Sequence, residues 1–320
     1  MAWEFPNKEN NELLSNGFPN YCAFELHNAA YPAKMAFETS RHLNDSNWTN
    51  EVAWPIVMES TRFFYAILSQ EKDGKWSIDI KPSMGQDENG GENCKNYLCS
   101  LYSAQYCLQT ALKLAEELDI QGIEIDNWKT ILKDGLAFNR LYNENNEFYD
   151  SCEGLSKESF GNEKHPVQLN PLTFTPFLTA DKYVKKAYEK RRDICSMTKL
   201  NHYPGWTLGA FWLASSHMES AGDLSYELSQ IVTAEYTDKE WISFFEHSSS
   251  YCQPYYITTH GLYVQAITDA IISDFWGETR FGKACPINWN HVEFYNLHTL
   301  DGKSWSGEKS LGNWKISEVL

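Results

Sequence analysis

Apolar residues recur every three or four positions through about the first 270 residues, which predicts a helical body. The clearest window is 96–118, where Leu101, Leu108 and Leu112 share one stripe; 51–68 has a similar stripe. Further helical windows cover 22–41, 126–140, 180–192, 205–220, 224–235 and 260–274. The loops between them are long and polar, notably 73–95, 143–171 and 238–254. Such loops on a helical scaffold are where we expect a functional site.

After about Asp274 the pattern changes. Three short stretches, 277–281, 292–295 and 314–316, are typical of strands separated by Gly, Pro, Asn and Asp. We therefore expect a mainly α chain, with a helical domain over 1–275 and a small β-rich segment over 276–320.

Composition narrows the functional class. The 320 residues carry 27 Lys and Arg against 43 Asp and Glu, a net charge of −16, which argues against nucleic acid or an anionic membrane as the partner. No apolar run reaches the roughly 18 to 20 residues of a membrane span. The first residues lack a signal-peptide pattern, whereas sequons at Asn44 and Asn47 would fit secretion, so the compartment stays open. The 12 Trp and 18 Tyr suit either sugar stacking or a large core.

The eight cysteines include no C-x-x-C pair, and no cluster of metal-ligand spacing is visible. We expect most of them to be small buried residues. One or two disulfides are an alternative if the protein lies in an oxidising compartment. No metal and no cofactor is predicted.

Two segments carry carboxylates suited to glycosidic cleavage, which needs one acid to protonate the leaving oxygen and a second carboxylate. The loop 82–92 places Asp87, Glu88, Glu92 and three glycines directly before the best helix, although a solvated turn has the same composition. Glu246 follows the aromatic run 241–245 and is the second candidate carboxylate; the alternative interpretation is that Glu246 is an ordinary surface residue. A Ser/His nucleophile is disfavoured because no G-x-S-x-G elbow occurs.

Six stretches, taken in order, resemble motifs of glycoside hydrolase family 65, the α-glucoside hydrolases and phosphorylases with an (α/α)6 barrel. The resemblance covers most of 1–300. The stretches are Met1-Ala2-Trp3-Glu4, Glu25-Leu26-His27-Asn28, Val57 to Phe64, Gly85-Gln86-Asp87-Glu88 with Asn96-Tyr97, Pro166-Val167-Gln168, and Tyr256 to Gln265.

This resemblance implies a role for each matching residue. Glu88 falls on the general acid, with Asp87 and Glu92 left open because the match slips by one position, and Glu246 falls on the general base of the hydrolases. The predicted substrate-binding residues are Trp3, Glu4, Asp87, Asn96, Gln168 and His260. Val167 stands where the family has Lys, which weakens one glucose contact.

The resemblance also implies inversion on a terminal α-glucosyl unit, in sugars such as kojibiose, nigerose, trehalose or glucosyl-galactosyl-hydroxylysine. The segment 202–208 lacks the serine pair of the family's phosphate loop, so hydrolysis is favoured over phosphorolysis. His27, Glu59 and Arg62 are interpreted as structural, the last two as a buried or half-buried pair.

The resemblance begins near the middle of a typical family member. The family's N-terminal β-sandwich and first barrel helices have no counterpart here, so we expect a partner chain or a missing N-terminal portion to complete the barrel. Three hypotheses follow: a hydrolase, a phosphorylase, and a non-catalytic or incomplete homologue that binds glycan or a partner chain.

Overall fold

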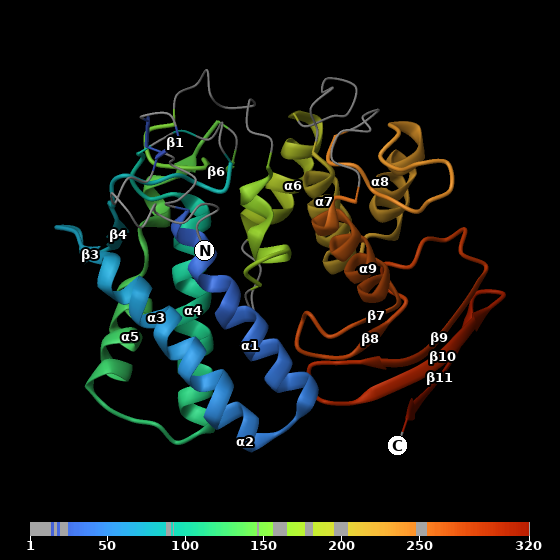
Figure 1. Ribbon diagram of the computed structural model, residues 1–320, viewed down its shortest axis with the longest axis horizontal. Coiled ribbons are helices and arrows are strands. Elements are labelled where there is room, and N and C mark those ends of the chain that lie inside the picture. The colour runs from blue at the N-terminus through green and yellow to red at the C-terminus, as the bar shows by residue number, and fades with distance from the viewer. Residues whose placement is uncertain are drawn as a thin grey trace. The chain divides into compact units, whose positions relative to one another are not determined.

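A computed structural model describes residues 25–87, 91, 93–145, 147–155, 165–176, 182–194, 204–247 and 255–319, and the short hairpin formed by β1 (Leu14–Ser15) and β2 (Phe18–Pro19). The chain is mostly helical, with small antiparallel sheets toward its C-terminal end, and this part of the sequence prediction is confirmed (Figure 1). Contacts divide the chain into two compact units. The first comprises 1–40 and 45–163, and the second comprises 41–44 and 164–320.

The first unit is organised around one buried helix, α4 (Leu98–Glu117), against which α3 and α5 pack (Figure 1). Leu101 and Leu108 on α4 are fully buried, as the apolar stripe predicts, whereas Leu112 of that stripe is half-buried and Leu114, outside the stripe, is fully buried. The Thr61 hydroxyl of α3 donates to the Cys107 carbonyl at 3.1 Å and joins the two helices. The other helical segments are η2 (Leu26–Ala29), α1 (Ala30–Leu43), α2 (Ser46–Trp48), η3 (Thr49–Ala53), α3 (Trp54–Ile67), α5 (Ile123–Asp134) and η4 (Ala137–Arg140).

Two of the long polar segments contain short hairpins. β3 (Leu68–Gln70) pairs with β4 (Trp76–Ile78), and β5 (Tyr142–Asn143) pairs with β6 (Phe148–Tyr149). Gly74, at φ +83°, lies in the turn between β3 and β4, a conformation that glycine adopts without strain. The acidic loop thus lies between strand β4, which is paired with β3, and the central helix α4.

The second unit is organised around α7 (Gly205–His217), of which only Trp206 is half-exposed. Its main neighbour is α9 (Ile257–Ile271). Gly205 and Gly209 lie one turn apart and face α9, since a Cβ built on Gly209 would lie 2.6 Å from Leu262 Cδ1. These two glycines let the helix backbones approach closely. The remaining helices are η5 (Val167–Leu172), α6 (Lys182–Ile194) and α8 (Ala221–Thr233).

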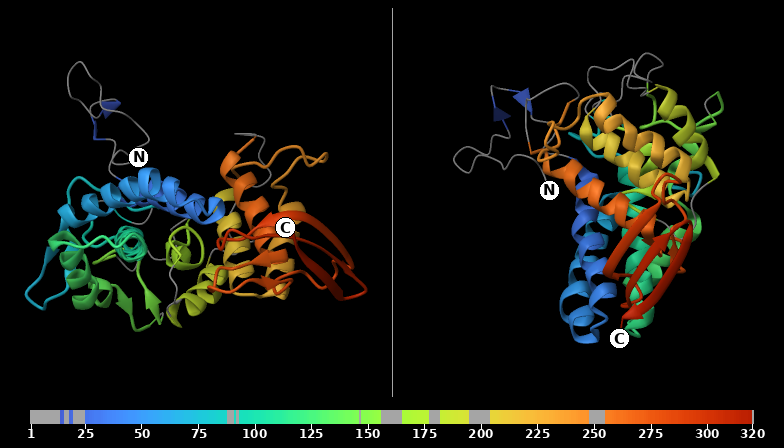
Figure 2. Two further views of the ribbon diagram at one scale, coloured as in Figure 1. Left: turned by 90° about the horizontal axis from the view of Figure 1, so that it is seen from below. Right: turned by 90° about the vertical axis from the view of Figure 1, so that its right-hand side faces the viewer.

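The C-terminal strands form two small sheets. β7 (Ile272–Ser273) pairs with β8 (Arg280–Phe281), and a three-stranded antiparallel sheet has the order β11-β10-β9 (Figure 2). Its strands are β9 (His291–His298), β10 (Ser304–Ser310) and β11 (Asn313–Val319). β10 was not predicted. Gly307 has no Cβ, which leaves room for Lys315 O of β11 and for the Phe294 ring of β9. The apolar side chain over this position therefore comes from a neighbouring strand.

Finer predictions about the architecture stay predictions. They are the (α/α)6 barrel and the division at residue 275 into a helical domain and a β-rich segment. Within the described ranges, no helix has both the length and the apolar character needed to cross a membrane.

Candidate active site

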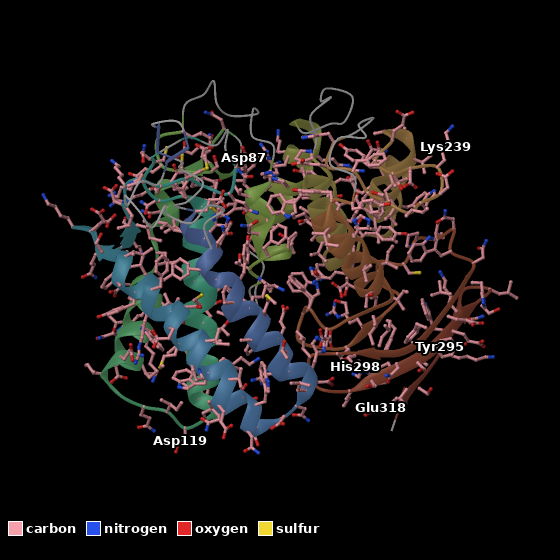
Figure 3. The ribbon with its side chains drawn as sticks, in the orientation of Figure 1. Asp87, Asp119, Lys239, Tyr295, His298 and Glu318 are labelled. Atoms are coloured by element: carbon pink, nitrogen blue, oxygen red, sulfur yellow. The ribbon has the colours of Figure 1, made fainter. Side chains whose placement is uncertain are left out.

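The first half of the acidic loop before α4 is packed against the protein and is not a solvated turn. Residues 83–87 are all buried, and Asp87 is 1% exposed. Figure 3 labels Asp87 within the first unit. The backbone N–H of Gln86 donates to Cys99 Sγ at 3.3 Å, and a Cβ on Gly85 would lie 2.8 Å from the Tyr97 ring. Glu88 and Glu92 lie outside the described residues. The turn interpretation of this loop is therefore wrong for its first half, whereas the role of general acid stays a prediction.

Asn96 holds the end of this loop in place. Its backbone N–H donates to Ile78 O at 2.9 Å, and its Oδ1 accepts the Ile78 N–H at 2.8 Å. Its Nδ2 donates to Glu153 at 2.6 Å and to Ser77 Oγ at 3.3 Å. The side chain is fully buried, and φ is +52°, which asparagine tolerates better than most residues. Asn96 thus has a positioning role, and direct substrate contact by it stays untested.

Glu246 lies beside the start of α7. Its carbonyl accepts the Gly205 N–H at 2.6 Å, and His247 forms an antiparallel bridge with Pro204. The Glu246 side chain is 22% exposed. A Cβ on Gly205 would lie 2.6 Å from Thr259 Oγ1, so α9 closes the other side of this junction.

Three buried polar atoms at this junction have no hydrogen-bond partner among the described residues: Glu246 Oε2, His247 Nδ1 and Thr259 Oγ1. His247 Nε2 is 3.9 Å from Glu246 Oε2, too long for a hydrogen bond. Buried polar groups are normally paired, so three such atoms on the two segments that border the start of α7 indicate a place where water or a ligand supplies the missing partners.

An aromatic group adjoins the same helix start. Trp206 stacks on Phe174 with ring centroids 4.8 Å apart, and His165 meets the Trp206 ring edge-on at 4.3 Å. His165 Nδ1 also hydrogen-bonds the Thr207 hydroxyl at 2.8 Å. All three rings are half-exposed. No sequence motif singled out this group, although Trp206 lies within the segment 202–208, which corresponds to the phosphate loop of family 65.

Two other predicted substrate-binding residues lie in the second unit. Gln168 is buried in η5, at 1% exposure. His260 is engaged at both ring nitrogens, because Nε2 accepts the Phe244 N–H at 3.1 Å and Nδ1 lies 3.0 Å from Tyr256 O. These contacts fix the Nδ1–H tautomer and give His260 a positioning role at the start of α9. Trp3 and Glu4 lie outside the described residues.

The second unit also contains a buried carboxylate that the sequence did not single out. Burial raises the pKa of Glu227 to about 7, and the nearby Arg192 guanidinium opposes that rise. Arg192 Nε lies 3.1 Å from Glu227 Oε1, and the Tyr188 hydroxyl donates to the same oxygen at 3.2 Å. Because Oε1 contacts both Arg192 and Tyr188 and the residue is 3% exposed, we assign this carboxylate to the core of the unit.

The residues interpreted as structural divide into two cases. His27 is 2% exposed, and burial lowers its pKa to about 3, so it is a neutral core residue. Arg62 pairs with Glu59 at 2.6 Å as expected, but the Glu59 side chain is 65% exposed. The expectation of a buried or half-buried pair is wrong, because Arg62 turns toward Glu124 on the surface of α5 and binds both its oxygens.

In the part of the chain that the structure describes, no three His, Cys, Asp or Glu side chains gather as a metal site requires.

Comparison with known proteins places the fold. No family model and no curated protein matches the sequence. The structure is similar to a solved structure described as "Putative kojibiose phosphorylase from human microbiome", with a TM-score of 0.66 and 11% identity, over 93% of this chain and 46% of that one. A second, described as "Sialidase", has a TM-score of 0.59 and 11% identity, over 92% of this chain and 31% of that one.

This chain therefore spans less than half the length of either solved structure. At this level of identity the likeness shows the fold. The fold is that of a helical protein with small antiparallel sheets, which the chain shares with two structures named after enzymes.

Proposed function

We propose that this chain is a carbohydrate-active enzyme, specifically an inverting glycoside hydrolase that releases a terminal α-glucosyl unit. The observation that carries the proposal is the group of unpaired buried polar atoms around Glu246, Gly205 and Thr259. The fold likeness over 93% of the chain supports the class of enzyme, and the order of the family 65 motifs supports the substrate.

In this mechanism Glu88 protonates the leaving oxygen and Glu246 activates a water molecule. Glu246 Oε2 is buried and takes no hydrogen bond from the described residues, so it is available to accept a proton from water. Inversion requires carboxyl groups about 6.5–9.5 Å apart, with the water between them. Trp206 and Phe174 offer half-exposed aromatic faces on which a sugar ring can stack.

Phosphorolysis is the second candidate, because one solved structure of similar fold is described as a phosphorylase. A phosphate dianion needs free hydroxyls, amides or cations. Near Glu246 the Thr207 hydroxyl is already paired with His165, and the Gly205 N–H is paired with Glu246 O, whereas the Thr259 hydroxyl has no partner among the described residues. One open hydroxyl is a smaller set of donors than a phosphate dianion needs, which favours water as the acceptor.

The test is release of glucose from α-linked disaccharides by the wild-type protein and by Glu88→Gln and Glu246→Gln. Each substitution is expected to lower kcat by about 10²–10⁴-fold, the usual contribution of a positioned acid or base. The exposed Glu240→Gln, on the segment before Glu246, is the matched control and should keep full activity. NMR of the first-formed anomer should show β-glucose.

Three results would redirect the proposal. Release that depends on phosphate would favour the phosphorylase. Unchanged activity in both variants would remove Glu88 and Glu246 from the mechanism. Absence of activity with and without phosphate, together with measurable glycan binding, would favour a non-catalytic homologue.

A further inference from the structure

Two cysteines in the first unit, Cys94 and Cys152, bring their sulfurs together beside the acidic loop. A Cβ built on Gly91 would lie 2.8 Å from Cys94 Sγ and 3.5 Å from Cys152 Sγ, so both sulfurs border the same glycine. The two thiols also hydrogen-bond each other. Cys94 is half-buried, whereas Cys152 is 1% exposed.

Backbone pairing holds the two cysteines in this arrangement. The Glu153 N–H donates to Lys95 O at 3.0 Å, and the Leu98 N–H donates to Ser151 O at 2.9 Å. These bonds fix the segment after Cys94 alongside the segment that contains Cys152. The fold therefore brings the two cysteine backbones to one place, and the rotamers of the two side chains bring both sulfurs to Gly91.

The two thiols differ from the other cysteine of the same cluster. The hydrogen bond from Cys152, helped by the Tyr97 hydroxyl and the charge of Lys81, lowers the pKa of Cys94 to about 6 even though partial burial opposes it. Burial raises the pKa of Cys99, which packs in the same cluster, to about 12. Since the thiolate is the nucleophile in exchange reactions, Cys94 is the reactive member and Cys99 is inert.

We propose that Cys94 and Cys152 form a thiol–disulfide exchange site, which takes a small disulfide such as glutathione disulfide and closes into an intramolecular disulfide. The Cys94 thiolate attacks one sulfur of the small disulfide, whose S–S bond breaks and releases one small thiolate. Cys152 then loses its proton to solvent and attacks Cys94 Sγ, which displaces the second small thiolate. Two protein thiols are oxidised, and one disulfide is reduced to two thiols.

The closed disulfide would tie the Gly91–Cys94 end of the acidic loop to the segment after β6. The Tyr97 hydroxyl already braces the loop end, since it donates to Gly91 O at 2.9 Å and accepts the Cys94 N–H at 3.0 Å, and the bond from the Glu153 N–H to Lys95 O joins that end to the segment after β6. Any effect on catalysis rests on the proposed function, because the same loop carries Asp87 and Glu88. The exchange chemistry itself does not depend on it.

The experiment treats the folded wild-type chain with glutathione disulfide between pH 5 and 8.5, blocks the remaining thiols after an acid quench, and maps peptides by mass spectrometry. We expect a 94–152 disulfide, with an exchange rate whose inflection lies near pH 6 and not near the ordinary thiol value of about 8.5. The assay reads covalent linkage, so it succeeds or fails whether or not the chain cleaves sugars.

Three variants complete the experiment. Cys152→Ser should stop at the mixed disulfide on Cys94, and Cys94→Ser should leave Cys152 reduced. Cys285→Ser, a buried cysteine of the second unit, is the matched control and should form the 94–152 bond normally. A glutathione adduct that persists on Cys94 in the wild-type protein would overturn the proposal, as would an inflection near pH 8.5.

Discussion

Replacing Gly209 by Ala tests the close approach of α7 to α9. In the interior of an exposed helix this change stabilises a protein by about 0.5–1 kcal/mol, because alanine has the higher helix propensity. At Gly209 the new methyl would lie 2.6 Å from Leu262 Cδ1 and 2.7 Å from Leu262 Cβ. Rotation of the side chain can move Cδ1, but Cβ is fixed to the backbone of α9. The two helices must therefore separate.

The size of the effect follows from these distances. Carbon atoms pack best at about 3.5–4.0 Å, so the new methyl is about 1 Å too close. Overpacking of a core costs about 1–3 kcal/mol, which outweighs the propensity gain of about 0.5–1 kcal/mol and leaves a net loss of up to about 2.5 kcal/mol. Gly261→Ala on α9 is the matched control. Its position is exposed and nothing lies within 4 Å of the added Cβ, so it should gain about 0.5–1 kcal/mol.

Thermal unfolding followed by circular dichroism measures both variants. The melting temperature should fall for Gly209→Ala and rise for Gly261→Ala, each by a few degrees, because about 1 kcal/mol shifts the transition of a domain this size by about 2–4 °C. Equal rises in both variants would refute the close packing of α7 on α9.

Three further predictions concern titration and charge. The pKa of buried Glu227 is raised from 4.5 to about 7, so the free energy of unfolding should fall as pH rises from 4.5 to 7, by on the order of 3 kcal/mol. Melting measured across this pH range should show that Glu227→Gln removes most of the fall. The pKa of buried His27 is lowered from 6.5 to about 3, so stability should fall as pH drops through that interval; His27→Gln should flatten this acid limb. Arg62→Ala should lower the free energy of unfolding by less than about 1 kcal/mol, because its partners Glu59 and Glu124 are partly exposed. In thermal unfolding at about 1 M salt this loss should be smaller, because salt screens exposed ion pairs.

Helices were predictable because their signal is local. The stripe through Leu101 and Leu108 repeats at the helical period, and α4 has the same residues fully buried. Strand β10 lacks such a signal. Its sequence, Ser304 to Ser310, has no alternation of apolar and polar residues, and Gly307 is required by the approach of Lys315 O from β11. That contact depends on how β11 pairs with β10, which the residues of β10 alone do not specify.

Site residues were harder to predict than helices, because a matching residue type does not specify its contacts. Asn96 and His260 match residues in motifs of family 65, and both are polar. In the fold, however, the amide of Asn96 pairs with Ile78 and Glu153, and the ring of His260 pairs with Phe244 and Tyr256. These partners lie up to 57 residues away along the chain, so only the folded structure reveals that the polar atoms are already used.

The contrast among buried carboxylates separates structural from functional groups. Buried Glu227 pairs with Arg192 and Tyr188 of α6, and half-buried Asp269 pairs with His217 of α7 at 2.9 Å, so each joins its helix to a neighbouring one. Glu246 Oε2 is the buried carboxylate oxygen without a hydrogen bond among the described residues. An unpaired buried acceptor costs stability, about 1–3 kcal/mol in typical cases. A fold built for stability alone would pair or replace such a group, so the unpaired oxygen of Glu246 is the feature that most favours a chemical role for this residue.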